Sequence, residues 1–367
     1  MTALGLLVLV LAAVPAVLTV MNLRLLRSTP RASPPDGATV SILIPARNEE
    51  DNIGEAIDCA LGSVGVPIEV VVMDDGSTDG TAAIVTSRAG RDRRVRLCTA
   101  PPLEGRWTGK VHACHHLSVA ARGTHLLFVD ADVRLAPHAA AALAGHGAAS
   151  GSKLVSAVPR QIMGSLGELL TVPMINFLLL GYLPMRLMRA SPDPGLGAAC
   201  GQMLLAERAA YQEVGGHAAI RHLLHDGIQL ARVFRRSGYR TDFLAGYDLA
   251  SCRMYRRLQE AWAGFAKNAH EGMATPLALP LWTLLLLGGH VLPFVLVALD
   301  PRWTAVAAAL LSLATRAVIS VSVRETLLTI PLHPLTVLTG LLIQWSAFLR
   351  IRVKRQAGWK GRLYPAD

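Results

Sequence analysis

The hydrophobic pattern along the chain changes twice, and these changes divide it into three parts. Residues 3–21 form an uncharged apolar stretch that is long enough to span a bilayer as a helix. Between residues 40 and 161 the pattern changes to short apolar runs separated by amphipathic stretches. Long apolar runs return between residues 275 and 349. The pattern therefore predicts a globular domain joined to membrane segments.

Short apolar runs in the middle part predict buried strands, and the stretches between them predict helices. The predicted strands are residues 40–46, 68–77, 95–100, 125–132 and 153–161, and the predicted helices are residues 48–61, 78–90 and 109–123. Strands that alternate with helices of this length predict an α/β domain whose mostly parallel sheet is covered on both faces. Such sheets bind ligands at the carboxyl ends of their strands, so we expect functional residues there.

Three apolar runs after this domain are further candidates for membrane segments, namely residues 275–299, 303–323 and 327–349. Arg24, Arg27 and Arg31 directly follow the first apolar stretch, so the positive-inside rule predicts a cytoplasmic domain. Three full crossings would then place the basic C-terminal tail outside, against the same rule. Two to three C-terminal membrane helices are therefore expected, and a re-entrant or interfacial run remains an alternative for one of them.

The sequence predicts a division of the whole chain. Residues 163–189 are apolar but interrupted by proline and glycine, which predicts an interfacial or acceptor-lining segment, with a transmembrane span as the alternative. The predicted parts are an N-terminal anchor (1–24), a globular domain (38–250), a juxtamembrane amphipathic segment (251–274), a C-terminal transmembrane region (275–349) and a basic cytoplasmic tail (350–367).

Composition and charge narrow the class of protein. Of 367 residues, 52% are hydrophobic and 17% are charged, which fits membrane attachment better than a plain soluble enzyme. The net charge is +10, but much of the excess lies beside apolar runs, so attraction to anionic lipid explains it better than nucleic-acid binding. Five cysteines without a CxxC pair predict a reducing compartment, and the histidines around Cys114 lack the second ligand cluster of a zinc site.

Acidic residues gather at the predicted strand ends. Asp130 and Asp132 end the fourth strand, and two carboxylates this close repel each other unless a cation lies between them. An Asp-x-Asp in this position can hold Mg²⁺ or Mn²⁺ that carries a diphosphate, although the motif also occurs by chance and in helix caps. Asp74 and Asp75 end the second strand, where a carboxylate can accept hydrogen bonds from a base or a ribose. A tight turn with a helix cap is the alternative for residues 74–79.

Two further residues are candidates for chemistry. Lys110 opens the third predicted helix, where its ammonium could pair with phosphate or could simply be solvated. Asp226 begins an amphipathic helix, where it could act as a general base on an acceptor hydroxyl or could cap the helix.

Five segments in order resemble the family 2 glycosyltransferases of the inverting GT-A type. They are "SILIPARNEE", "VVVMDDGSTDGT", "LLFVDAD", "GAACGQMLLAERAAYQEVGGH" and "LHDGIQLARVFRRSGYR", and they cover about residues 40–245. The resemblance implies a Rossmann-like GT-A domain and a nucleotide-sugar donor. It implies a donor site formed by Pro45, Arg47, Glu49, Asp74, Asp75, Lys110, Asp130 and Ala131.

The same resemblance implies roles in the reaction. Asp130 and Asp132 would hold the metal and the diphosphate, and Asp226 would deprotonate an acceptor hydroxyl that attacks the anomeric carbon with inversion. The acid that usually precedes this base is replaced by His225. Residues expected near the acceptor or in a lid are Gly201, Gln202, His225, Trp262 and Lys267.

Within the family, "GRWTGKVHAC", "CRMYRRLQEAWAGFAKN" and "GWKGRLY" resemble a membrane-bound group that includes carotenoid (diaponeurosporenoate-type) and hopanoid-associated enzymes. Processive members place Gln-x-x-Arg-Trp after the base, whereas here Gln259 and Trp262 occur without that arginine. We therefore expect a multi-pass plasma-membrane hexosyltransferase that moves a single sugar to a lipid hydroxyl or carboxyl. A polysaccharide synthase and a non-catalytic scaffold of the same fold remain the alternatives, and a transporter is disfavoured because the apolar segments carry few ionisable residues.

Overall fold

The computed structural model describes residues 2–26, 32–103, 105, 107–354, 356–359 and 362–365. Arg27 and Arg31, and part of the predicted basic tail, lie outside the described residues. The chain forms two compact units. The sheet unit comprises Leu26–Arg160 and Met185–Arg253, and the helical unit comprises Met1–Leu25, Gln161–Pro184 and Met254–Asp367.

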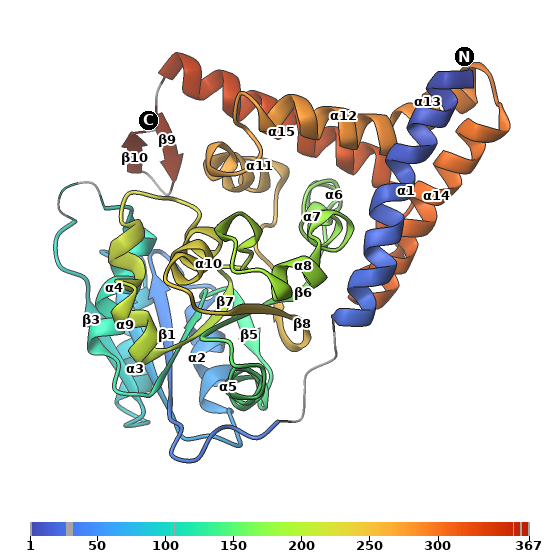
Figure 1. Cartoon of the computed structure of the whole chain (residues 1–367). Coiled ribbons are helices and arrows are strands. Elements are labelled where there is room, and N and C mark those ends of the chain that lie inside the picture. The colour runs from blue at the N-terminus through green and yellow to red at the C-terminus, as the bar shows by residue number, and fades with distance from the viewer. Residues whose placement is uncertain are drawn as a thin grey trace. The chain divides into compact units, whose positions relative to one another are not determined.

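The sheet unit is built on eight strands in the order β3-β2-β1-β4-β7-β6-β8-β5 (Figure 1). The first four strands along the chain are β1 (Val40–Ala46), β2 (Ile68–Asp74), β3 (Val95–Thr99) and β4 (His125–Val129). They pair in parallel, as the alternating pattern predicted. β1, β2 and β4 lie inside the sheet and have apolar runs, because strands in the middle of a covered sheet are buried on both faces.

The other half of the sheet is mixed. Its strands are β5 (Val133–Leu135), β6 (Leu154–Gln161), β7 (Met203–Glu207) and β8 (Thr241–Cys252). β7 runs antiparallel between β4 and β6, which separates two strands that the sequence predicted as part of one parallel sheet. The five-residue run of β7 follows a glycine-rich stretch and leads directly into the short helix Arg208–Glu213, and the alternating pattern did not predict it.

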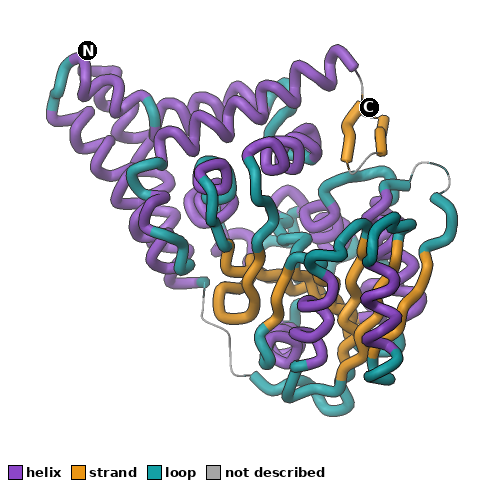
Figure 2. The backbone as a smooth tube through the Cα atoms, turned by 180° about the vertical axis from the view of Figure 1, so that it is seen from behind, coloured by secondary structure: helices purple, strands orange, loops and turns teal. Residues whose placement is uncertain are grey.

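Helices cover both faces of this sheet, as two opposite views show (Figures 1 and 2). The core on one face joins Leu43, Val71 and Phe128 of the strands to Leu117 of α4 and Phe234 of α10. The helices of the sheet unit are α2 (Ile53–Leu61), α3 (Thr81–Ala89), α4 (Gly109–Ala120), α5 (Ala139–Ser150), α8 (Met185–Ala190), α9 (Arg208–Glu213) and α10 (Asp226–Arg236), with 3-10 turns η1 (Pro194–Leu196) and η2 (Gly216–Ile220).

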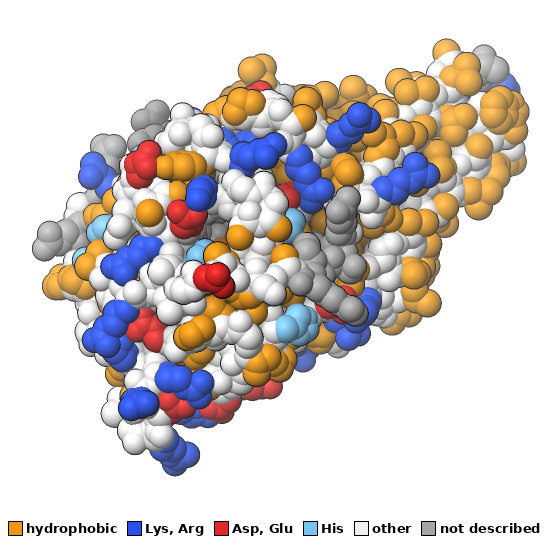
Figure 3. All heavy atoms as spheres, turned by 60° about the horizontal axis from the view of Figure 1, so that its bottom comes forward, with side chains coloured by type: hydrophobic (Ala, Val, Ile, Leu, Met, Phe, Trp, Pro, Cys, Tyr) orange, Lys and Arg blue, Asp and Glu red, His pale blue; other side chains and the backbone are white. Residues whose placement is uncertain are grey.

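The helical unit contains the long apolar helices. Its elements are α1 (Thr2–Leu25), α6 (Leu166–Leu169), α7 (Met174–Tyr182), α11 (Leu258–Lys267), η3 (Ala269–Glu271), α12 (Ala278–His290), α13 (Leu292–Leu299), α14 (Trp303–Ser322), η4 (Leu327–Thr329), α15 (His333–Lys354), β9 (Gln356–Trp359) and β10 (Arg362–Pro365). In the space-filling view, hydrophobic side chains gather over the helices at the right (Figure 3).

Two of these helices are long and apolar enough to cross a membrane, Ala3–Leu25 and Trp303–Ser322. The pair α12 and α13 meets the same criterion only as one span bent by 43°. The predicted run 327–349 instead begins with η4 and continues as α15, which does not meet the criterion among the described residues. The apolar helices between Leu166 and Tyr182 are shorter than a span, which disfavours the transmembrane alternative for this segment.

Arg316 lies inside α14, and its charge is paired with that of a carboxylate. Arg316 is fully buried and forms an ion pair with Glu325, whose other carboxylate oxygen accepts a hydrogen bond of 2.7 Å from the Asn176 amide. The Arg316 guanidinium also donates to the carbonyl of Pro173 at 3.0 Å. A buried charge persists only when it is paired, so these contacts join α14 to α7 within the helical unit.

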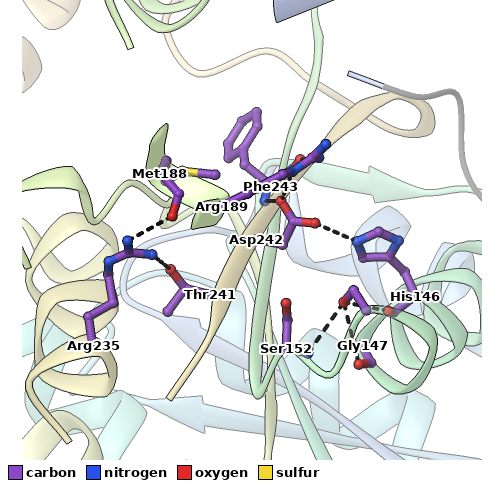
Figure 4. A network of polar contacts seen from close by, with 10 residues as sticks. His146, Gly147, Ser152, Met188, Arg189, Arg235, Thr241, Asp242 and Phe243 are labelled. Carbon is purple, nitrogen blue, oxygen red and sulfur yellow. Dashed lines mark hydrogen bonds and ion pairs between the residues drawn. The ribbon is translucent and has the colours of Figure 1, made fainter. Parts of the chain in front are cut away.

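A second buried network holds the sheet unit together where the chain re-enters it at α8 (Figure 4). The carboxylate of Asp242 on β8 accepts hydrogen bonds from Arg189 at 2.8 Å and His146 at 2.9 Å. Arg235 of α10 donates to the carbonyl of Met188 at 2.8 Å. Burial alone would raise the pKa of Asp242, but the contacts with His146 and Arg189 outweigh it and lower this pKa. The network therefore fixes α8 against β8 and α10.

We expect removal of this carboxylate to destabilise the sheet unit. In Asp242→Ala, Arg189 loses its buried partner, and breaking a buried ion pair from one side costs about 3–5 kcal/mol. Asp58→Ala is the control, because Asp58 is 57% exposed in its ion pair with Arg88 and exposed pairs contribute about 0.2–1 kcal/mol. Urea unfolding in detergent measures both free energies, and equal losses would contradict the role of Asp242.

Candidate active site

The carboxyl ends of β1, β2 and β4 lie at one edge of the sheet. Ala46 at the end of β1 pairs with Asp74 at the end of β2, and Leu43 of β1 pairs with Phe128 of β4. In this register, the residues after β4 are level with the residues after β1. The polar clusters that the sequence places after these strands therefore share an edge, where ligands of α/β sheets bind.

The loops after β1 and β2 are tied together. Asn48 has a left-handed backbone with φ 54°, and its side-chain oxygen accepts a hydrogen bond of 2.9 Å from the Thr78 amide. The Glu49 amide donates to the Thr81 hydroxyl at 2.8 Å. Nη1 of Arg47 donates to the carbonyl of Asp75 at 2.5 Å. Arg47 thus holds the loop after β2 in position. The sequence predicted Arg47 in a nucleotide pocket and did not predict this contact.

Part of the segment 74–79 forms the tight turn and the helix start that were the alternative to a binding role. Oδ1 of Asp74 accepts a hydrogen bond of 3.0 Å from the Ser77 amide, and Oδ1 of Asp79 accepts one of 3.0 Å from the Thr81 amide. These are the contacts of a turn and of a helix start. Pro45 lies within β1 opposite Met73, so it shapes the strand end that precedes the loop.

Lys110 lies at the centre of the acidic cluster. Its ammonium is 2.7 Å from Oδ1 of Asp130, 2.9 Å from Oδ2 of Asp226 and 3.1 Å from the carbonyl of Gly201. Burial alone would lower the pKa of Lys110, but the carboxylates of Asp130 and Asp226 raise it well above its ordinary value. The lysine is therefore charged. It contacts both Asp130, which is predicted to hold the diphosphate, and Asp226, which is predicted to be the base.

Asp132 has an environment that disfavours its charged form. Its Oδ1 is buried and has no hydrogen-bond partner. Burial, followed by the charges of Asp130 and Glu49, raises the pKa of Asp132 to about 7. Ala131 between the two acids is buried, which directs the chain so that both flanking carboxylates stay near the edge. A carboxyl with a raised pKa and an unused oxygen is a candidate functional group.

Close packing positions Asp226 at the start of α10. A Cβ on Gly201 would lie 2.6 Å from Oδ1 of Asp226, and a Cβ on Gly227 would lie 2.6 Å from the carbonyl of Ala199. A methyl group at 201 would push the Asp226 carboxylate aside and one at 227 would meet backbone, so the segment before β7 lies directly against the first turn of α10. His225 occupies the cap position and α10 begins at Asp226, so the capping alternative does not account for Asp226.

The family model described as glycosyl transferase family 2 matches residues 41–215. The chain carries a family 2 glycosyltransferase domain. Two relatives, the 4,4'-diaponeurosporenoate glycosyltransferases of Staphylococcus aureus strains MRSA252 and USA300, are 30% identical over 253 residues. The match covers 66% of this chain and 65% of each relative, so it spans slightly less than two thirds of their length.

The fold of the transferase is also found in a solved structure. A mannosyltransferase from Pyrobaculum calidifontis, in complex with GDP-Man and Mn²⁺, has a TM-score of 0.57 and 20% sequence identity. The alignment covers 95% of this chain and 98% of that protein. The likeness confirms the predicted α/β fold of GT-A type.

Sequence reasoning missed the thiol beside the acidic edge of the transferase domain. Cys252 at the end of β8 forms a hydrogen bond with Asp132, and the Gln202 amide donates to Sγ of Cys252 at 3.1 Å. Burial, with the nearby charge of Asp132, raises the pKa of the Cys252 thiol well above its usual range. The carbonyl of Gln202 accepts a hydrogen bond of 3.1 Å from the Asp130 amide. β8 was not predicted, so no signal placed Cys252 at this edge.

Two of the residues expected near the acceptor belong to the other unit. Trp262 and Lys267 lie on α11 of the helical unit, and their part in a lid stays a prediction. The other thirteen predicted site residues all lie in the sheet unit.

We expect the protein in EDTA to lose stability as the pH rises. Asp132 has a folded pKa of about 7, above its unfolded value of 3.8, so the folded state binds more protons between these values. This loss develops between about pH 4 and pH 7 and amounts to about 1.4 kcal/mol for each pKa unit. Asp132→Asn removes the charge and should raise the melting temperature in EDTA at pH 8.

The exposed Asp36→Asn is the matched control for this measurement, because it changes the charge equally at a solvated position. Thermal unfolding of the three proteins at pH 5 and pH 8 makes the comparison. A lower melting temperature for Asp132→Asn at pH 8 would contradict the strained state of this carboxyl.

Proposed function

We propose that this protein is an inverting, metal-dependent glycosyltransferase that moves one sugar from a nucleotide-sugar donor to a membrane lipid. The observation that carries the proposal is the cluster at one sheet edge, where Lys110 lies within 2.9 Å of both Asp130 and Asp226. The acid proposed for the donor and the acid proposed for the acceptor thus contact the same ammonium, which supports a site that holds both substrates close together.

The acids at the end of β4 fit a divalent cation. Oδ1 of Asp132 is buried without a partner, and Asp130 lies two residues away. No group of three His, Cys, Asp or Glu residues within the described part of the chain forms a complete metal site. Two carboxylates suit Mg²⁺ or Mn²⁺, which keep waters and bind substrate phosphates. When bound, such a cation would neutralise the charge that develops on the departing diphosphate.

The chain's own residues supply the remaining functions. The braced loops after β1 and β2, with Arg47, Glu49, Asp74 and Asp75, are proposed to bind the nucleoside. Asp226 is proposed to accept the proton of the acceptor hydroxyl, and Gly201 allows it to lie at the edge of the sheet. Attack from this side, opposite the diphosphate, inverts the anomeric carbon.

The lipid acceptor is proposed from two observations. The relatives in Staphylococcus aureus are named for a carotenoid acid, which is a lipophilic acceptor. The helical unit has two helices that are long and apolar enough to span a membrane, and its exposed hydrophobic side chains include Leu310 and Val321 of α14. A transferase domain on a membrane-inserted unit, in the cell membrane, meets acceptors that water does not dissolve. Trp262 and Lys267 of α11 are proposed to act in acceptor binding or in a lid.

A donor panel tests the proposal. The purified protein in lipid is given UDP-, GDP- and dTDP-sugars with Mn²⁺, with Mg²⁺ or with EDTA, and membrane lipid extract as acceptor. Release of the nucleoside diphosphate and labelled lipid are measured. We expect turnover of one donor that needs the metal and falls at least about 10²-fold in Asp226→Asn and in Asp132→Asn.

Asp58→Asn serves as the control in this panel, because Asp58 lies in an exposed ion pair on α2. Equal activity of Asp226→Asn and the wild type would exclude Asp226 as the base. Absence of turnover with every donor and both metals would favour a scaffold that has kept the fold alone.

Gly201→Ala tests the position of the base without removing it. The added methyl would meet Oδ1 of Asp226 at 2.6 Å, so the carboxylate must move, and a displacement of about 1 Å can cost about 10²-fold in rate. We expect kcat to fall while KM for the donor changes little. Gly90→Ala is the control, because its nearest contacts, at 3.6 Å, are of ordinary length. Unchanged kcat in Gly201→Ala would contradict the role of Asp226.

A further inference from the structure

Lys110 has all of its hydrogen-bonding capacity in use. An ammonium group has three donors, and three acceptors surround this one: Asp130 at 2.7 Å, Asp226 at 2.9 Å and the carbonyl of Gly201 at 3.1 Å. The ammonium cannot donate to a phosphate without giving up at least one of these contacts. If Lys110 is to contact a phosphate of the nucleotide-sugar donor, its side chain must therefore adopt a second arrangement in addition to this one.

A divalent cation on the acids after β4 would compete with this ammonium. Lys110 contacts Oδ1 of Asp130, one of the two carboxylates that fit the cation. A divalent cation on Asp130 would share this carboxylate with the Lys110 ammonium, and like charges that close repel each other. The cation alone therefore binds at a disadvantage. A diphosphate removes this disadvantage, because its negative oxygens can accept from the lysine and bind the metal together.

The backbone under Lys110 stays in place during such an exchange. The Thr108 amide donates to the carbonyl of Arg221 at 2.8 Å, and the Thr108 hydroxyl donates to the carbonyl of Leu223 at 2.9 Å. These bonds join the start of α4 to the segment that leads into Asp226. The exchange is therefore a movement of one long side chain, which leaves the edge of the sheet unchanged.

We propose that Lys110 is a latch that makes the binding of the divalent cation depend on the nucleoside diphosphate. The inference rests on the proposed function, because it assumes that the acidic edge is the donor site. In the donor-free state the ammonium takes the place of the missing positive charge. The cation and the diphosphate then enter as a pair, and the lysine changes from carboxylate to phosphate. Lys110 is thus a positioning residue for the donor complex.

Equilibrium binding of Mn²⁺ tests the latch without any turnover. Electron paramagnetic resonance measures free Mn²⁺ over the purified protein in lipid, alone and with GDP or UDP. For the wild type we expect weak binding of Mn²⁺ alone and at least about tenfold tighter binding with one of the nucleotides. For Lys110→Met we expect Mn²⁺ alone to bind at least about tenfold more tightly than to the wild type. The nucleotide should then add less than it adds in the wild type.

Three further variants make the comparison specific. Lys110→Gln removes the charge but keeps hydrogen bonding, and it takes the place of Lys110→Met if that variant lacks a cooperative melting transition. Lys110→Arg keeps the charge and should bind Mn²⁺ alone as weakly as the wild type. Lys153→Met is the matched control, because Lys153 forms its ion pair with Glu207 elsewhere in the sheet unit. It should bind Mn²⁺ like the wild type.

The outcomes separate the latch from the function on which it rests. If the wild type binds Mn²⁺ with GDP or UDP, but neither Lys110→Met nor Lys110→Gln binds Mn²⁺ alone more tightly, the latch is overturned and the donor site stands. If the wild type binds neither Mn²⁺ nor either nucleotide, the proposed function and the latch fall together. A gain that Lys110→Arg shares with Lys110→Met also overturns the latch, because that gain would not come from the charge.

Discussion

The concentration of negative charge at one edge of a sheet is the constraint on which the site depends. Parallel strands bring their carboxyl ends together, so Asp74, Asp130 and Asp132 share an edge because of the topology alone. Water cannot solvate all of these carboxylates, since Asp74 and Oδ1 of Asp132 are buried. The protein compensates with one lysine that faces two acids, and leaves Asp132 to be neutralised by a proton or a cation.

Close packing and hydrogen bonds hold the backbone around the charged side chains of this edge. Glycines at 201 and 227 allow the backbone before β7 to touch the first turn of α10, and the loops after β1 and β2 are joined by hydrogen bonds of their own. The network around Asp242 fixes the opposite end of α10 through Arg235. The charged side chains of the site are therefore attached to a backbone that close packing and hydrogen bonds hold in position.

The part of the fold with regular alternation was predictable, and the part without it was not. Strands β1 to β4 and the helices between them follow from apolar runs and amphipathic stretches, with only their ends displaced. β7 and β8 were not predicted, because the short apolar run of β7 does not distinguish a strand from a buried helical turn, and β8 mixes glycine and polar residues with its apolar ones. The site follows the same division. Asp74, Asp130 and Asp132 come from strand ends, whereas the meeting of Lys110 with Asp226 depends on a tertiary contact between the starts of α4 and α10, and Cys252 depends on β8.

The excursion between Arg160 and Met185 has a practical meaning for work on the sheet unit. The chain leaves this unit after β6, passes through α6 and α7 of the helical unit, and returns at α8. Trimming both termini back to residues 26–253 would leave an apolar 24-residue segment (161–184) attached to the sheet unit. A water-soluble version for crystallisation or calorimetry must therefore replace that internal segment with a short polar linker. The new linker would end just before α8, which the Arg189–Asp242 ion pair holds in the sheet unit.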